Sequence, residues 1–337
     1  NPGVSWESVK KTNIGLDYGF FNNAISGSID YFSDDRIDVL VSGGDRAIPD
    51  YYGTEAPVAN LGRVKNEGYE LVLNLNHNFT PDLRVWADLN MTHAENVTID
   101  RDDAELTPNY QKDEGYAINQ ARTFIDNGFY NTWDELYGST QHNTNDSQKL
   151  PGGYQIIDFN GDGVIDDFDQ TPYGFAGAPQ NTYNATVGFD WKGLSAFVQF
   201  FGANNVTRQV VFNSLGNQNN IVYDEGSYWS KDNTNADAPV PRWVSTPNGA
   251  SNGSRFFYDA SYVRLKNAEI AYTFTADSKL LKTFGFDSLR LFLNGNNLYV
   301  WTKMPDDRES NFAGTGWASQ GAYPTVKRFN FGLNITF

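Results

Sequence analysis

Residues 327–337 read KRFNFGLNITF, and this stretch decides the fold class. Its odd positions are apolar and its even positions are polar or small: Phe329, Phe331, Leu333, Ile335 and Phe337 against Arg328, Asn330, Gly332, Asn334 and Thr336. Strict period-2 alternation predicts a β-strand with one apolar and one polar face. The length suits a tilted crossing of an outer membrane, and a terminal Phe is unusual because chain ends commonly fray into polar residues. We therefore expect Phe331 and Leu333 to face lipid, and Asn330 and Asn334 to face a lumen.

The same alternation recurs along the chain and predicts an all-β protein. Nine strands are expected, at residues 13–20, 25–31, 69–76, 83–92, 183–191, 194–200, 262–274, 289–298 and 327–337. In the seventh of these, the apolar parity slips between Leu265 and Ala268. A slip of parity inside a strand predicts a β-bulge, because one extra residue reverses the faces of all that follow.

The connections between these strands alternate in length. Short ones are expected at residues 21–23, 80–82 and 192–193, with a somewhat longer one at 275–288; long ones at 37–60, 97–182, 205–259 and 301–326. Aromatic residues such as Phe20, Phe79, Trp191 and Phe274 flank the short turns, as an interfacial girdle requires. Long loops on one side only are typical of an outer-membrane β-barrel. A soluble β-sandwich or jelly roll also alternates, but long structureless loops are uncommon in compact domains.

Composition narrows the function classes. The formal net charge of −16 argues against nucleic acid as a partner. There is no cysteine, so disulfides and thiolate metal sites are excluded. Mean hydropathy is −0.53 although aromatic residues make up 15%. A barrel that hides its lipid face in alternate positions has this soluble-looking average, and no apolar run is long enough for a membrane helix.

Nine strands do not make a conventional barrel. Bacterial single-chain barrels normally have an even number of strands, and the first strand here would leave an open edge in lipid. The chain also begins on Asn1 without a signal peptide. These features predict that residues 1–337 are the carboxy-terminal portion of a larger barrel, whose remaining strands and lumen-filling segment lie upstream.

The sharpest local motif is DFNGDGVIDDFD at residues 158–169. It matches a twelve-residue calcium loop of the EF-hand or dockerin type, in which alternating oxygens wrap one hard cation and a glycine makes the tight turn. The predicted Ca²⁺ ligands are Asp158, Asn160, Asp162, the Val164 carbonyl, Asp166 and Asp169. Asp at the last position is shorter than the usual Glu, so bidentate closure is less favoured. The alternative is an Asx/Gly-rich turn without an ion.

No catalytic constellation stands out, so we expect a protein that is not an enzyme. His77, His93 and His142 are widely separated and lack metal-ligand spacing. Aromatic residues in the long loops are a second signal, because flat rings among polar side chains bind sugars and extended peptides. The substrate candidates are Tyr130, Trp133, Tyr137, Trp229, Trp243 and Trp317. The alternative is that these rings pack the loops against one another.

Six segments resemble the carboxy-terminal barrel of SusC-like TonB-dependent transporters, the outer-membrane nutrient importers of Bacteroidetes. They are NPGVSWESVKKTNIGLDYGFFNNAISGSIDYF at 1–32, NLGRVKNEGYELVLNLN at 60–76, YWSKDNTNADAPVPRW at 228–243, DASYVRLKNAEIAYTF at 259–274, LRLFLNGNNLYVWTK at 289–303 and AYPTVKRFNFGLNITF at 322–337. The resemblance covers nearly the whole chain in the right order. The terminal Phe337 strand also resembles the closing strand that the barrel-assembly machinery recognises.

The resemblance implies a 22-stranded barrel with an amino-terminal plug, of which this chain would supply strands 14–22. It also implies a SusD-like surface lipoprotein as a lid, and the TonB complex, coupled to the proton-motive force, as the driver. The last strand would run inward, which places the carboxy terminus in the periplasm and the long loops outside. We expect active import of oligosaccharide or peptide. A structural or assembly subunit of a larger outer-membrane complex is the first alternative, and a soluble carbohydrate-binding β-sandwich the second.

Overall fold

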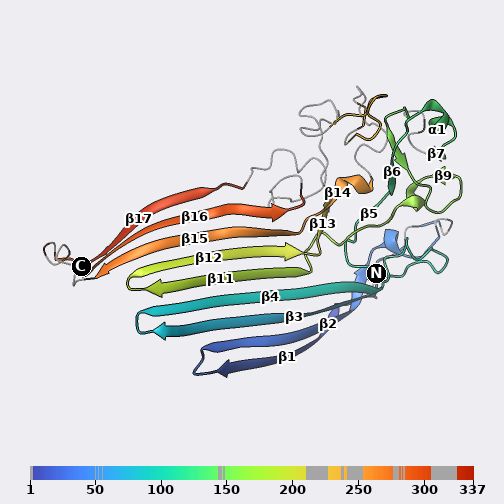
Figure 1. Ribbon diagram of the computed structural model, residues 1–337. Helices are drawn as coiled ribbons and strands as arrows, with labels where there is room; N and C mark the ends of the chain where they lie inside the picture. Colours follow the sequence, from blue (N-terminus) through green and yellow to red (C-terminus); the bar gives the residue numbers. More distant parts are fainter. Residues whose placement is uncertain are drawn as a thin grey trace.

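The structure is a computed structural model dominated by one antiparallel sheet of nine strands (Figure 1). It describes residues 3–49, 51, 53–54, 56–142, 146, 149–209, 227–236, 239–240, 253–275, 281, 283, 285–304 and 325–337. The strands are β1 (Ser8–Phe20), β2 (Ile25–Val41), β3 (Ala59–Thr80), β4 (Leu83–Asp100), β11 (Asn181–Trp191), β12 (Leu194–Asn204), β15 (Tyr262–Thr275), β16 (Ser288–Thr302) and β17 (Arg328–Thr336). They lie side by side in chain order. All nine predicted strands are thereby confirmed, and several are longer than predicted.

The predicted bulge is also present. Gln199 of β12 pairs with Asn267 of β15, and the next residue, Phe200, pairs with Leu265. Lys266 is therefore the extra residue, and the pairing of β15 with β16 shifts at the same place. The bulge restores the apolar parity that the sequence loses between Leu265 and Ala268.

The connections differ at the two ends of the sheet. At one end, β11 and β12 are joined by Lys192 and Gly193, whose φ values of 48° and 86° are those of a tight hairpin turn. At the other end, the long connections carry short elements: η1 (Gly43–Asp45), β5 (Arg122–Thr123), β6 (Asp126–Phe129), α1 (Trp133–Tyr137), β7 (Gln141–His142), β8 (Tyr154–Ile156), β9 (Val164–Ile165), η4 (Asp167–Asp169), β10 (Thr171–Pro172), β13 (Thr207–Gln209), η5 (Ser254–Phe256) and β14 (Phe257–Asp259). In Figure 1 these elements gather beyond that end, which we call the long-loop end. No helix among the described residues is long and apolar enough to cross a membrane.

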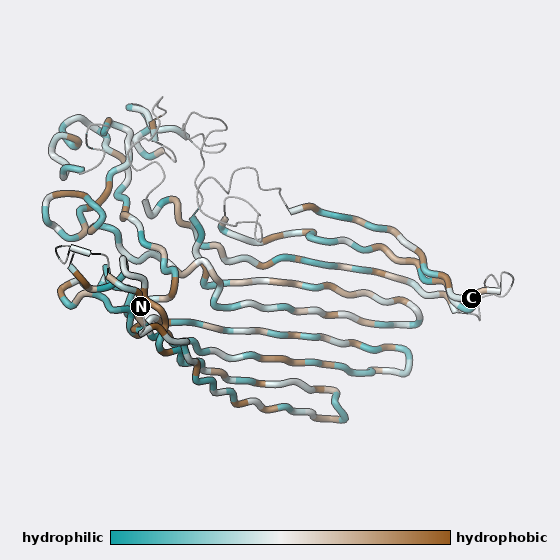
Figure 2. The backbone as a smooth tube through the Cα atoms, turned by 180° about the vertical axis from the view of Figure 1, so that it is seen from behind, coloured by the Kyte–Doolittle hydropathy of each residue, from teal (hydrophilic) through white to brown (hydrophobic). Residues whose placement is uncertain are grey.

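One face of the sheet is apolar and uncovered. A single register row across six strands contains Val85, Phe189, Ala196, Ile270, Leu293 and Phe331. Phe331 is 73% exposed and Leu333, on the same face, 55% exposed. The other sheets in the described part of the chain have two strands each, so none of them forms the second layer of a β-sandwich. Figure 2 shows the fine alternation of hydrophobic and hydrophilic residues along each strand.

The height of the apolar face matches a bilayer. On β3, the outward aromatic residues Tyr69 and Phe79 lie ten residues apart, a distance of about 33 Å along a strand. With the usual tilt of barrel strands, this corresponds to an apolar band about 25 Å tall, as in outer-membrane barrels. Beyond Tyr69, towards the long-loop end, outward positions carry charges: Lys65 pairs with Glu67 at 2.9 Å, and Arg63 with Asp35 at 2.7 Å.

The opposite face is polar and hydrogen-bonded across the strands. Asn330 of β17 donates to Asn294 of β16 (2.8 Å), and Asn294 donates to Glu269 of β15 (3.2 Å), which also binds Arg290. A parallel ladder runs through Asn296, Asn267, Gln199 and Asn184, with Gln199 donating to Asn184 at 2.8 Å. Asn330 therefore lies on the face predicted for it, opposite Phe331 and Leu333.

Glycines on this sheet are paired with aromatic rings. Five aromatic residues lie directly opposite a glycine of the neighbouring strand: Tyr18 and Gly27, Phe32 and Gly68, Trp86 and Gly188, Tyr183 and Gly202, Phe292 and Gly332. A Cβ added to Gly188 would lie 2.5 Å from the Trp86 ring, so the ring occupies the space that the missing side chain leaves. This packing protects backbone that a glycine would otherwise expose.

The sheet has two open edges. Among the described residues, β1 pairs only with β2 and β17 only with β16, so the first and last strands lie at opposite ends of the sheet. The expectation that these nine strands do not close on themselves is confirmed.

A matched pair of substitutions on β11 tests which face meets lipid. Val187→Arg places a charge on the apolar face, and we expect it to lower the free energy of unfolding in bilayers by about 2–4 kcal/mol. Thr186→Arg, one residue away on the polar face and opposite Asp88, is the control and should cost less than about 1 kcal/mol. Denaturant titration of the full-length protein in lipid vesicles measures both, and equal costs would contradict the assignment of faces.

Candidate functional site

The long connections are joined by a small hydrophobic core at the long-loop end. Phe129, Tyr154, Trp229 and Phe256 form a buried cluster, against which Ala236 and Val240 pack. We call these six residues the loop core. They come from the connection between β4 and β11 and from that between β12 and β15, so two loops far apart in sequence share one interior. The Trp229 indole also donates to Asn131 at 2.9 Å.

An arginine contact fixes the edge of the loop core. The Arg255 guanidinium binds the Asp126 carboxylate at 2.8 Å and lies over the rings of Phe129 and Tyr154, at 4.7 and 4.0 Å from their centroids. The second Asp126 oxygen accepts from the Ser254 hydroxyl and the Arg255 backbone N–H, both at 2.9 Å. Burial disfavours the ionised carboxylate, but the hydrogen bond and charge of Arg255 outweigh it and hold the pKa of Asp126 below its usual value.

A second arginine network links the connection between β2 and β3 to the connection after β4. Arg46 binds Asp102 at 3.2 Å, and Arg101 binds Asp45 at 3.0 Å and Asp113 at 3.2 Å. Hydrogen bonds from Ser42 and then from Arg101 lower the pKa of Asp45. The side chains of the two Arg101 pairs are 40–48% exposed, and exposed ion pairs contribute little to stability and are screened by salt.

The aromatic candidates fall into two groups. Tyr130 and Trp229 are only 1% and 7% exposed, so packing of the loops accounts for their positions. Trp133 and Tyr137 are 51% and 78% exposed and stack on each other, with ring centroids 5.8 Å apart. Trp243 and Trp317 lie outside the described residues. The structure therefore leaves one exposed aromatic pair, on α1, as a surface for a flat ligand.

Local interactions make α1 a rigid support for this pair. The Thr132 hydroxyl accepts from the Glu135 N–H at 3.1 Å, and the Glu135 carboxylate accepts from the Asn131 N–H at 2.6 Å. This resembles a capping box, and the T-x-x-E pattern that encodes it is visible in the sequence. The i, i+4 spacing of Trp133 and Tyr137 predicts that their rings meet on one helix face. Together these two patterns distinguish Trp133 and Tyr137 from the other loop aromatics.

The predicted calcium loop adopts a tight, internally hydrogen-bonded turn. Asp158 accepts from the N–H groups of Gly161 (2.8 Å) and Gly163 (2.9 Å), whose φ values of 74° and 89° favour glycine. Asp162 accepts from the Val164 N–H at 2.9 Å. Asn160 accepts from the Asp162 N–H at 2.9 Å, Asp166 from the Phe168 N–H at 2.8 Å, and Asp169 from the Phe159 and Asp166 N–H groups at 2.7 and 2.8 Å.

The tight turn and its buried anchor suit a calcium loop, but the carboxylates do not gather around one point. Ile165 is fully buried with Phe124 and Ile156, which anchors the loop as the motif requires. Each oxygen that accepts an N–H bond keeps a second lone pair, and the donor set is the one that Ca²⁺ prefers. Among the described residues, however, no three His, Asp or Glu side chains gather in a group that could hold a metal ion. Binding would therefore require these carboxylates to turn towards a common centre.

The fold places the chain among the outer-membrane β-barrels. In the solved structure of the RagAB peptide transporter, the matched part covers 36% of that chain and all of this one, with a TM-score of 0.69 and 22% sequence identity. An "open-open" state of the RagAB peptide importer matches with a TM-score of 0.66. At these identities the likeness shows the fold alone.

Sequence comparison then gives the class of protein. No protein-family profile matches the chain. The whole chain is similar to TonB-dependent receptor P3 of Formosa agariphila (29% identity), to receptor P26 of the same organism (24%), and to TonB-dependent receptor SusC of Bacteroides thetaiotaomicron (23%). The predicted resemblance to SusC-like TonB-dependent receptors is thereby confirmed. The chain spans 32–35% of the length of these relatives, which are receptors and transporters rather than enzymes.

The Arg255–Asp126 contact predicts how the loop core responds to mutation and pH. Arg255→Ala leaves a buried carboxylate unpaired and should destabilise the loop core by about 3–5 kcal/mol. Arg101→Ala, which removes exposed ion pairs of the second network, is the control and should cost about 1 kcal/mol or less. Hydrogen exchange of residues 126–131 and 254–256 measures both, and equal protection in the two variants would contradict this role of Arg255.

The pH dependence follows from the lowered pKa of Asp126. A carboxyl whose pKa is lower in the folded than in the unfolded state stabilises the fold above its unfolded pKa. The stabilisation is lost as the pH falls through the folded pKa. Protection of residues 126–131 should therefore be constant from neutral pH down to the ordinary aspartate range and decline below it in the wild-type protein. Asp126→Asn should flatten this decline.

Proposed function

We propose that this chain forms part of the barrel wall of a TonB-dependent, SusC-like importer in the bacterial outer membrane. The similarity of the whole chain to such receptors carries the proposal. The two faces of the sheet support it, because an uncovered apolar band on one side and hydrogen-bonded polar ladders on the other suit a wall between lipid and a water-filled or protein-filled lumen.

The open edges of the sheet call for further strands. Unpaired backbone groups at β1 and β17 cannot face hydrocarbon, because each unsatisfied group costs several kcal/mol there. We propose that the complete barrel has 22 strands, that its other strands pair with both edges of this sheet, and that a plug fills the lumen. TonB would act on that plug, with the proton-motive force as the energy source.

Orientation and partners follow from the same assignment. The short turns and the carboxy terminus would lie in the periplasm, and the loop core and α1 outside the cell. A SusD-like lipoprotein would cover the long-loop end. A structural or assembly subunit of an outer-membrane complex remains the second candidate, since a barrel wall of this kind is also compatible with a protein that transports nothing.

The substrate would be an oligosaccharide or a peptide. The exposed rings of Trp133 and Tyr137 favour an oligosaccharide, because sugar rings present flat apolar faces to aromatic side chains. The RagAB relatives are peptide importers, which keeps a peptide as the alternative substrate.

We also propose that Ca²⁺ binds the loop at residues 158–169, through Asp158, Asn160, Asp162, the Val164 carbonyl, Asp166 and Asp169. The ion would bring together carboxylates that otherwise repel one another, and it would stiffen the connection that carries α1. With Ca²⁺, limited proteolysis of residues 97–182 should be slower than with a chelator. Asp162→Ala should abolish the difference, whereas Asp134→Ala, on α1, should keep it. Identical cleavage with and without Ca²⁺ would leave the loop as an Asx/Gly turn.

Uptake of labelled oligosaccharides and peptides by cells that carry the full-length protein tests the transport proposal. Loss of TonB should abolish uptake, and uptake that persists without TonB would refute the proposal. Replacing both Trp133 and Tyr137 by Ala removes two stacking contacts of about 0.5–1.5 kcal/mol each and should weaken substrate binding roughly tenfold. Leu106→Ala, at an exposed side chain of the same connection, is the control and should have no effect.

A further inference from the structure

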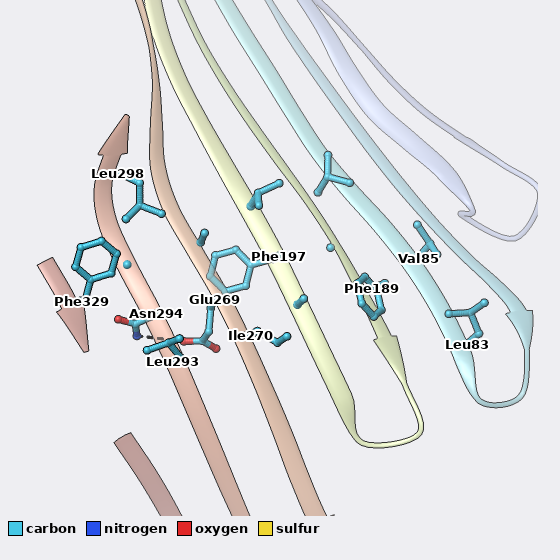
Figure 3. A pocket seen from close by; sticks show the side chains of 16 residues that line it. Leu83, Val85, Phe189, Phe197, Glu269, Ile270, Leu293, Asn294, Leu298 and Phe329 are labelled. Atoms are coloured by element: carbon cyan, nitrogen blue, oxygen red, sulfur yellow. Dashed lines mark hydrogen bonds between the residues drawn. The ribbon is translucent and has the colours of Figure 1, made fainter. Parts of the chain in front are cut away.

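The apolar face contains a groove that crosses six strands, from β4 to β17. Its volume is about 610 Å³. Figure 3 shows the residues that line it: Leu83 and Val85 lie at one end, Phe189 and Ile270 in the middle, and Leu293 and Phe329 at the other end. On the proposed function, the groove is therefore set into the face that meets the membrane.

Small side chains create the groove. Ala196 lies between Phe189 and Ile270 in one register row, and Ala268 pairs with Gly295 in the next. Large apolar side chains flank Ala196 and Ala268, so the surface is lower there than on either side, whereas the Leu298 side chain fills the space next to Gly295. The polar residues of the lining belong to the opposite parity: Glu269 lies between Ala268 and Ile270 in sequence and binds Asn294 and Arg290 in the polar ladder. The groove itself offers only apolar contact.

The short-turn end of the groove lies beside a pair of opposite charges. Leu83 pairs with Trp191, and the residues next to them in the two turns are Asp82 and Lys192. The Lys192 ammonium is 3.8 Å from the Asp82 carboxylate, and both side chains are about 60% exposed (64% and 59%). An ion pair this long and this exposed is weak, so both groups can bind other charges.

We propose that the groove binds one phospholipid that has an amine-bearing, zwitterionic headgroup. One acyl chain would lie over Ala196 and Ala268. The phosphate would meet Lys192, and the ammonium would meet Asp82. Two observations specify this ligand. The groove is continuous with the proposed lipid-facing surface, and its end carries a cation beside an anion, which can pair with the phosphate and the ammonium of a zwitterionic headgroup. Trp191, 49% exposed, provides the aromatic contact usual at headgroup level.

Retained lipid measures this binding directly. The full-length protein is purified from its native outer membrane in mild detergent and washed extensively, and bound phospholipid is then quantified by phosphorus assay and native mass spectrometry. The wild-type protein should keep about one phospholipid per barrel. Ala196→Leu with Ala268→Leu fills the groove and should lower retention at least tenfold. Ala87→Leu with Ala185→Leu adds the same volume to the same face outside the groove, and this control should retain the lipid.

The headgroup is tested by competition between amine-bearing zwitterionic and purely anionic phospholipids added to delipidated protein. Lys192→Gln and Asp82→Asn should each lower the preference for the zwitterionic lipid, whereas Lys303→Gln, near the long-loop end, should not. Circular dichroism confirms that each variant retains its strands. Loss of all lipid from the wild-type protein on washing, or equal retention by the groove-filled variant and its control, would overturn the proposal. If the Lys192 and Asp82 variants prefer the zwitterionic lipid as strongly as the wild-type protein does, the assignment of the headgroup is overturned.

Discussion

The pairing of every backbone N–H and C=O group inside hydrocarbon is the constraint on which this structure depends. Water cannot satisfy those groups there, so each strand must lie against another along its membrane-crossing length. The nine strands meet the requirement in the simplest way, since each pairs with its neighbours in the sequence. Among the described residues only the outer sides of β1 and β17 remain unpaired, and in the proposed barrel further strands would cover them.

A single alternation serves both faces of this sheet. Odd-numbered residues of β17 are apolar and exposed, while Asn330 and its amide neighbours bind across the strands on the other side. The glycine–aromatic pairs also fill space on the sheet, because each ring lies where the glycine has no side chain. Trp86 over Gly188 gives the polar face a flat apolar surface without widening the strand spacing. On the apolar face, Ala196 and Ala268 line the groove, whereas the Leu298 side chain fills the space next to Gly295.

Local patterns predict the features that depend on local geometry. The strand positions follow from period-2 alternation, and the bulge at Lys266 follows from a slip of that period. The extension of β3 beyond Tyr69 was not predicted, because outward residues there are charged and the contrast between the faces disappears. The burial of loop residues was not predicted from the sequence either. Trp229 is buried and donates to Asn131, 98 residues away, and no local pattern reports such a contact. The calcium spacing predicts a tight turn with the right oxygens, but spacing does not fix where each carboxylate points.

The arginine contacts of the loops differ in how far water and salt can reach them. Arg255 is enclosed by two rings and a carboxylate, so its contact resists salt and fails only when the loop core unpacks. Arg46 pairs with Asp102 at a half-buried position, whereas Arg101 binds Asp45 and Asp113 through exposed pairs that water and ions can replace at little cost. Raised ionic strength should therefore weaken the Arg101 pairs before it weakens the contact of Arg255 with the loop core.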